Sequence, residues 1–169
     1  ARFLAARRLA EAASVLAHLD ADEGGRFPLT GVGDVNTYAL FAESIYNIVA
    51  SRGHAGFILP TGIATDDTTK DFFGDIVARR RLVSLLSFYE IRRWFPDTDD
   101  RKPFCLITLG CNDSPEFAFD VGSLSELQNQ EKRFRLTADD FHQLNPNTRT
   151  LPTFRSRKDS ELTKKIYTN

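Results

Sequence analysis

The amino-acid sequence predicts an α/β fold, in which helices lie on the faces of a mixed sheet. Phe57 to Leu59 form a short apolar run bounded by Gly56 and Pro60. Such a run is typical of a strand buried on both faces, and strands of that kind belong mainly to parallel sheets. Amphipathic helices are predicted on either side, over 34–52 and 67–79. The order helix, buried strand, helix favours an α/β layered architecture.

The composition is that of one globular domain. A chain of 169 residues can bury a sizeable core, and its net charge of −1 gives no general attraction to nucleic acid or membranes. No signal peptide and no apolar run of membrane-spanning length is found, so we expect a cytoplasmic protein. The chain contains no methionine and begins inside a predicted helix, which suggests a piece of a longer protein.

The two cysteines do not form a recognisable metal or redox motif. Cys105 and Cys111 lack C-x-x-C spacing, and no histidine lies near them in the sequence. We therefore expect two reduced thiols and no metal site.

The amino-terminal third is predicted to hold two helices and a loop. Residues 3–19 form a helix with an apolar stripe and a charged opposite side. The polar loop 20–33 contains Gly31-Val32-Gly33, which lacks the preceding strand and the third glycine of a phosphate-binding loop. We interpret it as a flexible lead into the helix over 34–52.

The rest of the chain contains further strands and two short helices. Apolar runs over 81–88 and 104–109 predict buried strands, and alternating patterns over 116–121 and 132–136 predict edge strands. Thr137 precedes a short helix whose first turn is acidic, which indicates a capped start. The end is turn-rich and closes with a charged helix.

Four segments resemble, in order and spacing, consecutive motifs of one family. They are Asn36–Glu43, Gly56–Thr61, Phe95-Pro96 ahead of Phe104–Leu109, and Asn145–Arg157. The family is that of the DNA adenine-N6 methyltransferases of the restriction-modification type, in particular the fused restriction-and-modification enzymes and related phage-defence methylases. The resemblance covers nearly the whole chain from Arg26 on.

The resemblance implies a partial Rossmann-like methyltransferase fold. Residues 1–144 would be the carboxyl-terminal half of the catalytic domain, and 145–169 a basic exit segment leading toward a recognition domain. Two family elements are absent: a strand ending in a Gly-x-Gly cofactor turn and the catalytic Asn/Asp-Pro-Pro-aromatic tetrapeptide. Asn145-Pro146-Asn147 lacks the second proline and the aromatic. In the family both elements precede the matched motifs, so we expect the chain to begin just beyond them. It would hold no catalytic residue and be inactive alone.

By resemblance, the parent enzyme transfers a methyl group from S-adenosylmethionine to adenine N6 in double-stranded DNA. The target base leaves the stack, and aromatic rings replace its lost stacking. Phe95 matches the family's second stacking ring, and Pro96 would stiffen its loop. Phe41 matches a ring that packs on the cofactor's adenine. From the residues alone, a core position is favoured for Phe95, and packing on the sheet is an equal alternative for Phe41.

Basic residues are the candidates for contacts with DNA phosphates. Two stand beside the loop of Phe95 and four in the exit segment: Arg101, Lys102, Arg149, Arg155, Arg157 and Lys158. Arg155 and Arg157 could instead brace the turn between domains. Residues 97–102 superficially resemble the acidic-acidic-Lys pattern of metal-dependent nucleases, but they belong to one loop, so we interpret them as a solvated turn.

A partial sheet would leave one strand edge unpaired. We expect the amino-terminal helix to cover that edge or a second copy of the chain to pair with it. Two other functional interpretations stay open: a non-catalytic module that binds DNA or a partner, and an unrelated nucleotide enzyme of the same layered fold.

Overall fold

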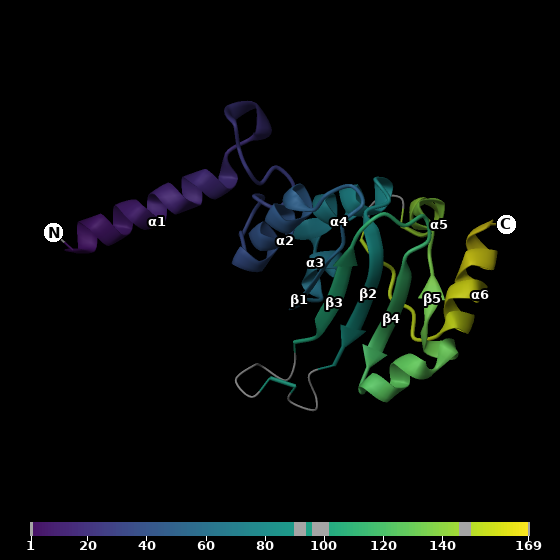
Figure 1. Ribbon diagram of the computed structural model, residues 1–169. Helices are drawn as coiled ribbons and strands as arrows, with labels where there is room; N and C mark the ends of the chain where they lie inside the picture. The colour runs from purple at the N-terminus through teal and green to yellow at the C-terminus, as the bar shows by residue number, and fades with distance from the viewer. Residues whose placement is uncertain (1, 90–93, 96–101, 146–149, 169) are drawn as a thin grey trace.

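The computed structural model describes residues 2–89, 94–95, 102–145 and 150–168. Its centre is a mixed sheet of five strands in the order β1-β3-β2-β4-β5 (Figure 1). The strands are β1 (Ala55–Pro60), β2 (Leu82–Phe88), β3 (Phe104–Leu109), β4 (Glu116–Val121) and β5 (Phe134–Arg135). β3 runs antiparallel to its neighbours β1 and β2, whereas β2 and β4 are parallel. β1, β2 and β4 therefore end at one side of the sheet, the carboxyl edge.

Helices stand close to the places that the sequence predicts. They are α1 (Arg2–His18), α2 (Thr37–Ile48), α3 (Gly62–Thr65), α4 (Lys70–Ala78), α5 (Ala138–Leu144) and α6 (Arg157–Thr168), with 3-10 turns η1 (Ala21–Glu23), η2 (Asp67–Thr69), η4 (Leu124–Gln128) and η5 (Gln130–Lys132). The predicted cap of α5 is confirmed as a capping box between Thr137 and Asp140. No described helix is long and apolar enough to cross a bilayer.

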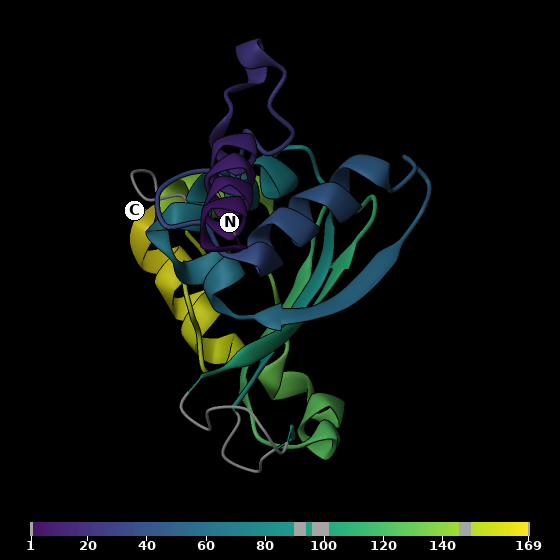
Figure 2. The same ribbon diagram turned by 90° about the vertical axis from the view of Figure 1, so that its left-hand side faces the viewer.

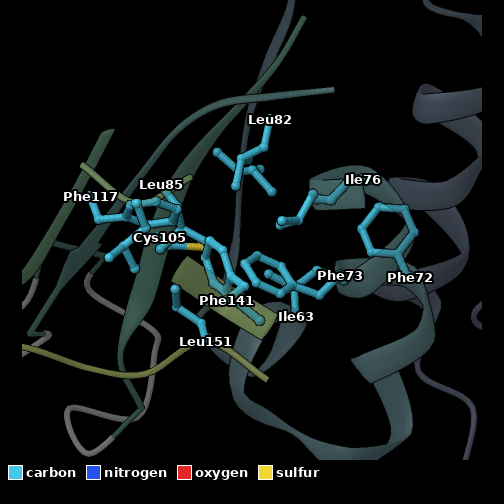
Figure 3. Close-up of a cluster of buried hydrophobic side chains, with 14 of the residues drawn as sticks. Ile63, Phe72, Phe73, Ile76, Leu82, Leu85, Cys105, Phe117, Phe141 and Leu151 are labelled. Carbon is cyan, nitrogen blue, oxygen red and sulfur yellow. The ribbon is translucent and has the colours of Figure 1, made fainter. Parts of the chain in front are cut away.

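The main core lies between one face of the sheet and helices α2 to α5 (Figure 3). Four helix side chains that are fully buried, Ile63, Phe72, Phe73 and Ile76, meet Leu85, Cys105, Ile107 and Phe117 from the strands. Phe73 and Phe117 each meet Phe141 of α5 edge to face, with ring centroids 5.8 and 5.7 Å apart. A second, smaller cluster lies on the other face, around Phe88, Ala118 and Val121.

The expectation that β1 is buried on both faces of a parallel sheet is wrong. β1 is an edge strand that pairs only with β3, antiparallel, and its side chains alternate between the core and the exposed face. Ile58, in the middle of the apolar run, is 50% exposed. An unbroken run of three apolar residues cannot distinguish these two situations, because strand neighbours are set by distant parts of the chain.

The two strands expected at an edge differ from each other. β4 is interior, since it pairs with β2 on one side and β5 on the other. The strand expected over 132–136 shortens to the two residues of β5. Asp120 has a left-handed φ of 55° where the register between β2 and β4 shifts, so β4 ends in a bulge.

Helix α1 forms as predicted, but its apolar stripe is not packed. It projects away from the sheet in Figure 1 and is seen end on in Figure 2. It does not cover the outer edge of β1, which was one of the two expected alternatives. Ala17 is buried, and every other α1 residue whose burial is described is exposed. The lead into α2 is more constrained than expected: a Cβ on Gly31 would lie 2.0 Å from the Ala17 carbonyl oxygen. Only glycine permits that close approach.

Candidate functional site

Four aromatic side chains gather at the carboxyl edge. This aromatic cluster consists of Phe88 at the end of β2, Phe104 at the start of β3, and Trp94 and Phe95 between them. The antiparallel register places Phe88 directly opposite Phe104, and their rings stack at 5.3 Å with an interplanar angle of 6°. Trp94 meets both rings edge to face, with centroid distances of 5.7 and 6.3 Å.

Phe95 is the outermost ring of this cluster. It contacts Phe104 edge to face at 5.2 Å and is 39% exposed, whereas Phe88 beneath is 1% exposed. A ring in this position is anchored from below and open to solvent on part of its surface. Such a ring can offer a surface to a planar ligand. Its neighbours Pro96 and Arg101, also predicted site residues, lie outside the described residues.

Two buried hydroxyl groups occupy the same edge of the sheet. Thr61, directly after β1, and Ser87 in β2 are 5% and 4% exposed, and their side-chain oxygens are 2.9 Å apart. Between them in the sheet lies Cys105, whose burial raises the pKa of its thiol to about 12. Ser87 was not among the residues predicted from the sequence. In the sequence, Ser87 is a polar residue inside a predicted apolar strand. That position indicates a buried polar contact only when the neighbouring strands are known.

The loop that leaves β1 lies near the first turn of α2. Burial raises the pKa of the Tyr38 hydroxyl, and the nearby Asp66 carboxylate raises it further. Thr69 donates to the Gly62 carbonyl at 2.8 Å, which closes the loop into a compact turn.

Phe41 lies on α2, one turn beyond Tyr38. Its ring is 67% exposed, so the alternative that it is a core residue is wrong. None of the described ring contacts joins it to the aromatic cluster. Its contact with a cofactor stays a prediction.

Two of the predicted basic residues lie at the carboxyl edge of the sheet. Lys102 is exposed two residues before Phe104. The Arg155 side chain is 87% exposed, and its Nε lies 3.8 Å from the Asp120 carboxylate. Asp120 belongs to the bulge at the end of β4, and its neighbour Val121 pairs with Phe88. Topology brings Arg155 to this edge, although the sequence separates it widely from Phe104.

The other basic residues are placed less specifically. Arg157 forms an ion pair with Glu161 at 2.8 Å along α6, so part of its charge is already neutralised. Lys158 is exposed on the first turn of the same helix. Arg149 lies outside the described residues. The proposed boundary at residue 145 also stays a prediction.

The partly exposed Phe95 ring can stack on a flat ligand, and the basic side chains at the same edge of the sheet can attract phosphate. Within the described ranges, no group of three or more histidine, cysteine, aspartate or glutamate side chains is arranged to hold a metal ion. Of the acidic loop 97–102, the structure describes only Lys102.

The chain matches no family model and no curated relative. Its fold is similar to the methyltransferase subunit of a type I restriction-modification system from Streptococcus thermophilus, with a TM-score of 0.54 and 15% sequence identity. The shared architecture is a Rossmann-like α/β fold. The match covers 82% of this chain and 36% of that subunit, so the chain spans about a third of its length. A second similar structure is the type IIG restriction endonuclease BpuSI, at 16% identity and a TM-score of 0.49 over 69% of this chain and 16% of that one.

Proposed function

We propose that this chain is the carboxyl-terminal part of a methyltransferase domain that methylates adenine N6 in DNA, and that Phe95 stacks on the target base after it leaves the duplex. The observation that carries the proposal is the position of Phe95 at the carboxyl edge. Its ring is held by Phe104 and partly exposed. In open α/β sheets, ligands bind at that edge.

The stacked rings beneath Phe95 make it a suitable base platform. Phe104 contacts Phe95 and is itself stacked on Phe88, so the Phe95 ring is held in place. Little side-chain conformational freedom is therefore lost when a base stacks on it. Stacking of one base on an aromatic side chain is worth about 1–3 kcal/mol, similar to the cost of extruding a base.

The residues of this chain are suited to contact only the adenine part of S-adenosylmethionine. S-adenosylmethionine supplies an electrophilic methyl group when bound. Phe41 offers an exposed ring that could pack on its adenine. The sequence has no Gly-x-Gly turn after a strand and no Asn/Asp-Pro-Pro-aromatic tetrapeptide. We therefore expect no methyl transfer by this chain alone.

Lys102 and Arg155 would hold the DNA backbone beside the base. Lys102 precedes Phe104 by two residues and Arg155 lies beside Asp120 at the end of β4, so the two cations come to the carboxyl edge from different segments and could contact different phosphates. Such contacts add affinity without sequence preference, and they weaken as salt rises.

Binding of two duplexes tests the base-stacking role. One duplex is fully paired, and the other carries an adenine opposite an abasic site, where extrusion costs less. Trp94 is the only tryptophan, and its contact with Phe104 makes its fluorescence a reporter of the site. We expect the unpaired adenine to be preferred. Phe95→Ala should reduce that preference by about fivefold or more, since stacking contributes about 1–3 kcal/mol.

Two further variants separate the candidate functions. Leu124→Ala removes a side chain that is 61% exposed on η4 and should change neither affinity. Lys102→Gln should weaken both duplexes equally and reduce the salt slope by about one. If Phe95→Ala leaves both affinities unchanged while Lys102→Gln lowers them, the chain is a non-catalytic DNA-binding module. Equal binding of the two duplexes by the wild type would refute the base-stacking proposal.

The gene provides an independent test. By the family resemblance, an Asn-Pro-Pro-aromatic tetrapeptide should be encoded within a few residues upstream of Ala1. A parent sequence without it would contradict the assignment as an adenine-N6 methyltransferase.

A further inference from the structure

A short segment at the carboxyl edge is not used by the proposed function. Residues 122–133 leave the end of β4, form the turns η4 and η5, and return to β5. Three consecutive amide side chains stand where the two turns meet, Gln128, Asn129 and Gln130, and all three are exposed. We call them the amide turn. Because side-chain amides carry both donors and acceptors, such a run at an edge proposed to meet DNA is suited to contact bases.

The two turns hold this segment in one shape. The Asn129 N–H donates to the Glu126 carbonyl at 3.0 Å, and the Lys132 N–H donates to the Asn129 carbonyl at 3.1 Å. Asn129 Oδ1 also accepts from the Glu131 N–H at 3.0 Å, so the side chain of Asn129 caps η5. The backbone that carries the two glutamines is therefore ordered before any ligand binds, which lowers the entropic cost of a contact.

The amide turn neighbours both groups of residues that the proposed function assigns to DNA. On one side, Leu127 packs against the smaller core around Phe88, which belongs to the aromatic cluster of Phe95. On the other side, η5 contacts α6, the helix that begins at Arg157. Figure 1 shows this segment as the green turns at the lower end of β4, beside the lower end of α6. A duplex held at Phe95 and at the exit segment would pass close to the amide turn.

The charges of the segment are compatible with a nearby duplex. Glu126 Oε2 lies 3.9 Å from Lys132 Nζ. The hydrogen bond to Glu161 raises the pKa of Arg157, and the nearby Glu131 carboxylate raises it further. Both acidic residues of the segment thus lie near cations, which limits their repulsion of phosphates.

The two glutamines have uncommitted side chains. Among the described residues, no protein hydrogen bond occupies the amide group of Gln128 or Gln130. A glutamine amide can donate and accept at once, which suits N6 and N7 of adenine in the major groove. Asn129 differs, because its Oδ1 is already used within the turn.

We propose that Gln128 and Gln130 contact the edges of the base pairs that flank the extruded adenine. This inference rests on the proposed base-stacking function and adds to it a preference for the flanking sequence. Asn129 is a positioning residue, since its side chain fixes the turn that presents the two glutamines.

Selection from a duplex library tests the contact with bases. Every duplex carries an adenine opposite an abasic site, and the base pairs on either side of it are randomised. Sequencing of the bound and unbound pools should show that the wild type enriches particular flanking pairs. Gln128→Ala and Gln130→Ala should each lower the enrichment at one flanking position about fivefold or more, the discrimination expected of a bidentate contact.

Matched variants control for effects on folding and on surface composition. Gln143 is an exposed glutamine on α5, which follows β5 at the opposite edge of the sheet, so Gln143→Ala should leave the enrichment unchanged. Circular dichroism melting verifies that all variants fold. Amide hydrogen exchange tests the positioning role: the Glu131 amide should exchange faster in Asn129→Ala and stay protected in Asn129→Asp, which keeps the acceptor oxygen.

Failure of this inference and failure of the base-stacking proposal give different results. A wild type that prefers the unpaired adenine but enriches no flanking pair refutes the role of the amide turn and leaves base stacking in place. Wild-type enrichment in both glutamine variants has the same meaning. A wild type with no preference for the unpaired adenine refutes base stacking, and the inference about flanking pairs falls with it.

Discussion

Substitution of Phe88 by alanine should destabilise the chain and loosen the site together. The ring is 1% exposed, stacks on Phe104 at 5.3 Å and meets Trp94 edge to face at 5.7 Å. Truncation of a buried phenylalanine typically costs about 3–5 kcal/mol. Because alanine cannot make either aromatic interaction, each worth about 0.5–1.5 kcal/mol beyond area burial, we expect the upper part of that range.

The expected loss of stability is large enough to measure in two ways. For a chain of this size, each 1 kcal/mol lowers Tm by about 2–4 °C, so Phe88→Ala should lower it by about 8 °C or more. Trp94 reports the same change locally, because an indole that loses its neighbouring ring becomes more hydrated. We expect its emission maximum to move to longer wavelength in the folded variant.

Circular dichroism melting and tryptophan emission, measured on Phe88→Ala and Phe88→Leu, provide the assay. Phe88→Leu keeps apolar volume but not the stacked plane, so it should retain most of the stability and still change the Trp94 emission. Phe95→Ala should cost less stability, since that ring is 39% exposed. If Phe88→Ala lowers Tm by less than about 3 °C and leaves Trp94 emission unchanged, the cluster does not hold the Phe95 ring in place.

Two predictions concern pH. Burial alone would raise the pKa of Asp140, but hydrogen bonds from Lys164 and Thr137 outweigh it and hold that pKa below its usual value. The carboxylate therefore stabilises the fold above about pH 4, and this contribution is lost as pH falls further. Urea unfolding of Asp140→Asn should show lower stability at pH 7 and a smaller decline at acid pH; an unchanged acid decline would contradict the assignment. Burial, then the hydrogen bond to Asp75, raises the pKa of Tyr46 to about 12. Its contribution is complete below about pH 10 and is lost as pH rises toward 12. Tyr46→Phe should lose about 1 kcal/mol at pH 8 and decline less in alkali; a parallel alkaline decline in variant and wild type would argue against this role.

The predictions that succeeded depend on residues close together in the sequence. The apolar runs over 81–88 and 104–109 became β2 and β3, and Thr137 caps α5 as its spacing from Asp140 predicted. A cap forms between residues three positions apart, so the sequence contains everything it needs.

The site could be predicted only in part. Phe95 and Phe41 were named from motifs, and the structure places both at exposed positions. The Thr61–Ser87 contact and the approach of Arg155 to Asp120 could not be predicted, because each joins segments that meet only after the strands have paired.

The sequence by itself determined the alternation of helices and strands, the capped start of α5 and the apolar content of β1. Only the tertiary structure decided that β1 is an edge strand and that the stripe of α1 stays exposed. Local pattern shows how apolar a segment is, whereas burial depends on which distant segment packs against it. For β1 that neighbour is β3 on one side, and the opposite backbone groups are left to pair with another strand.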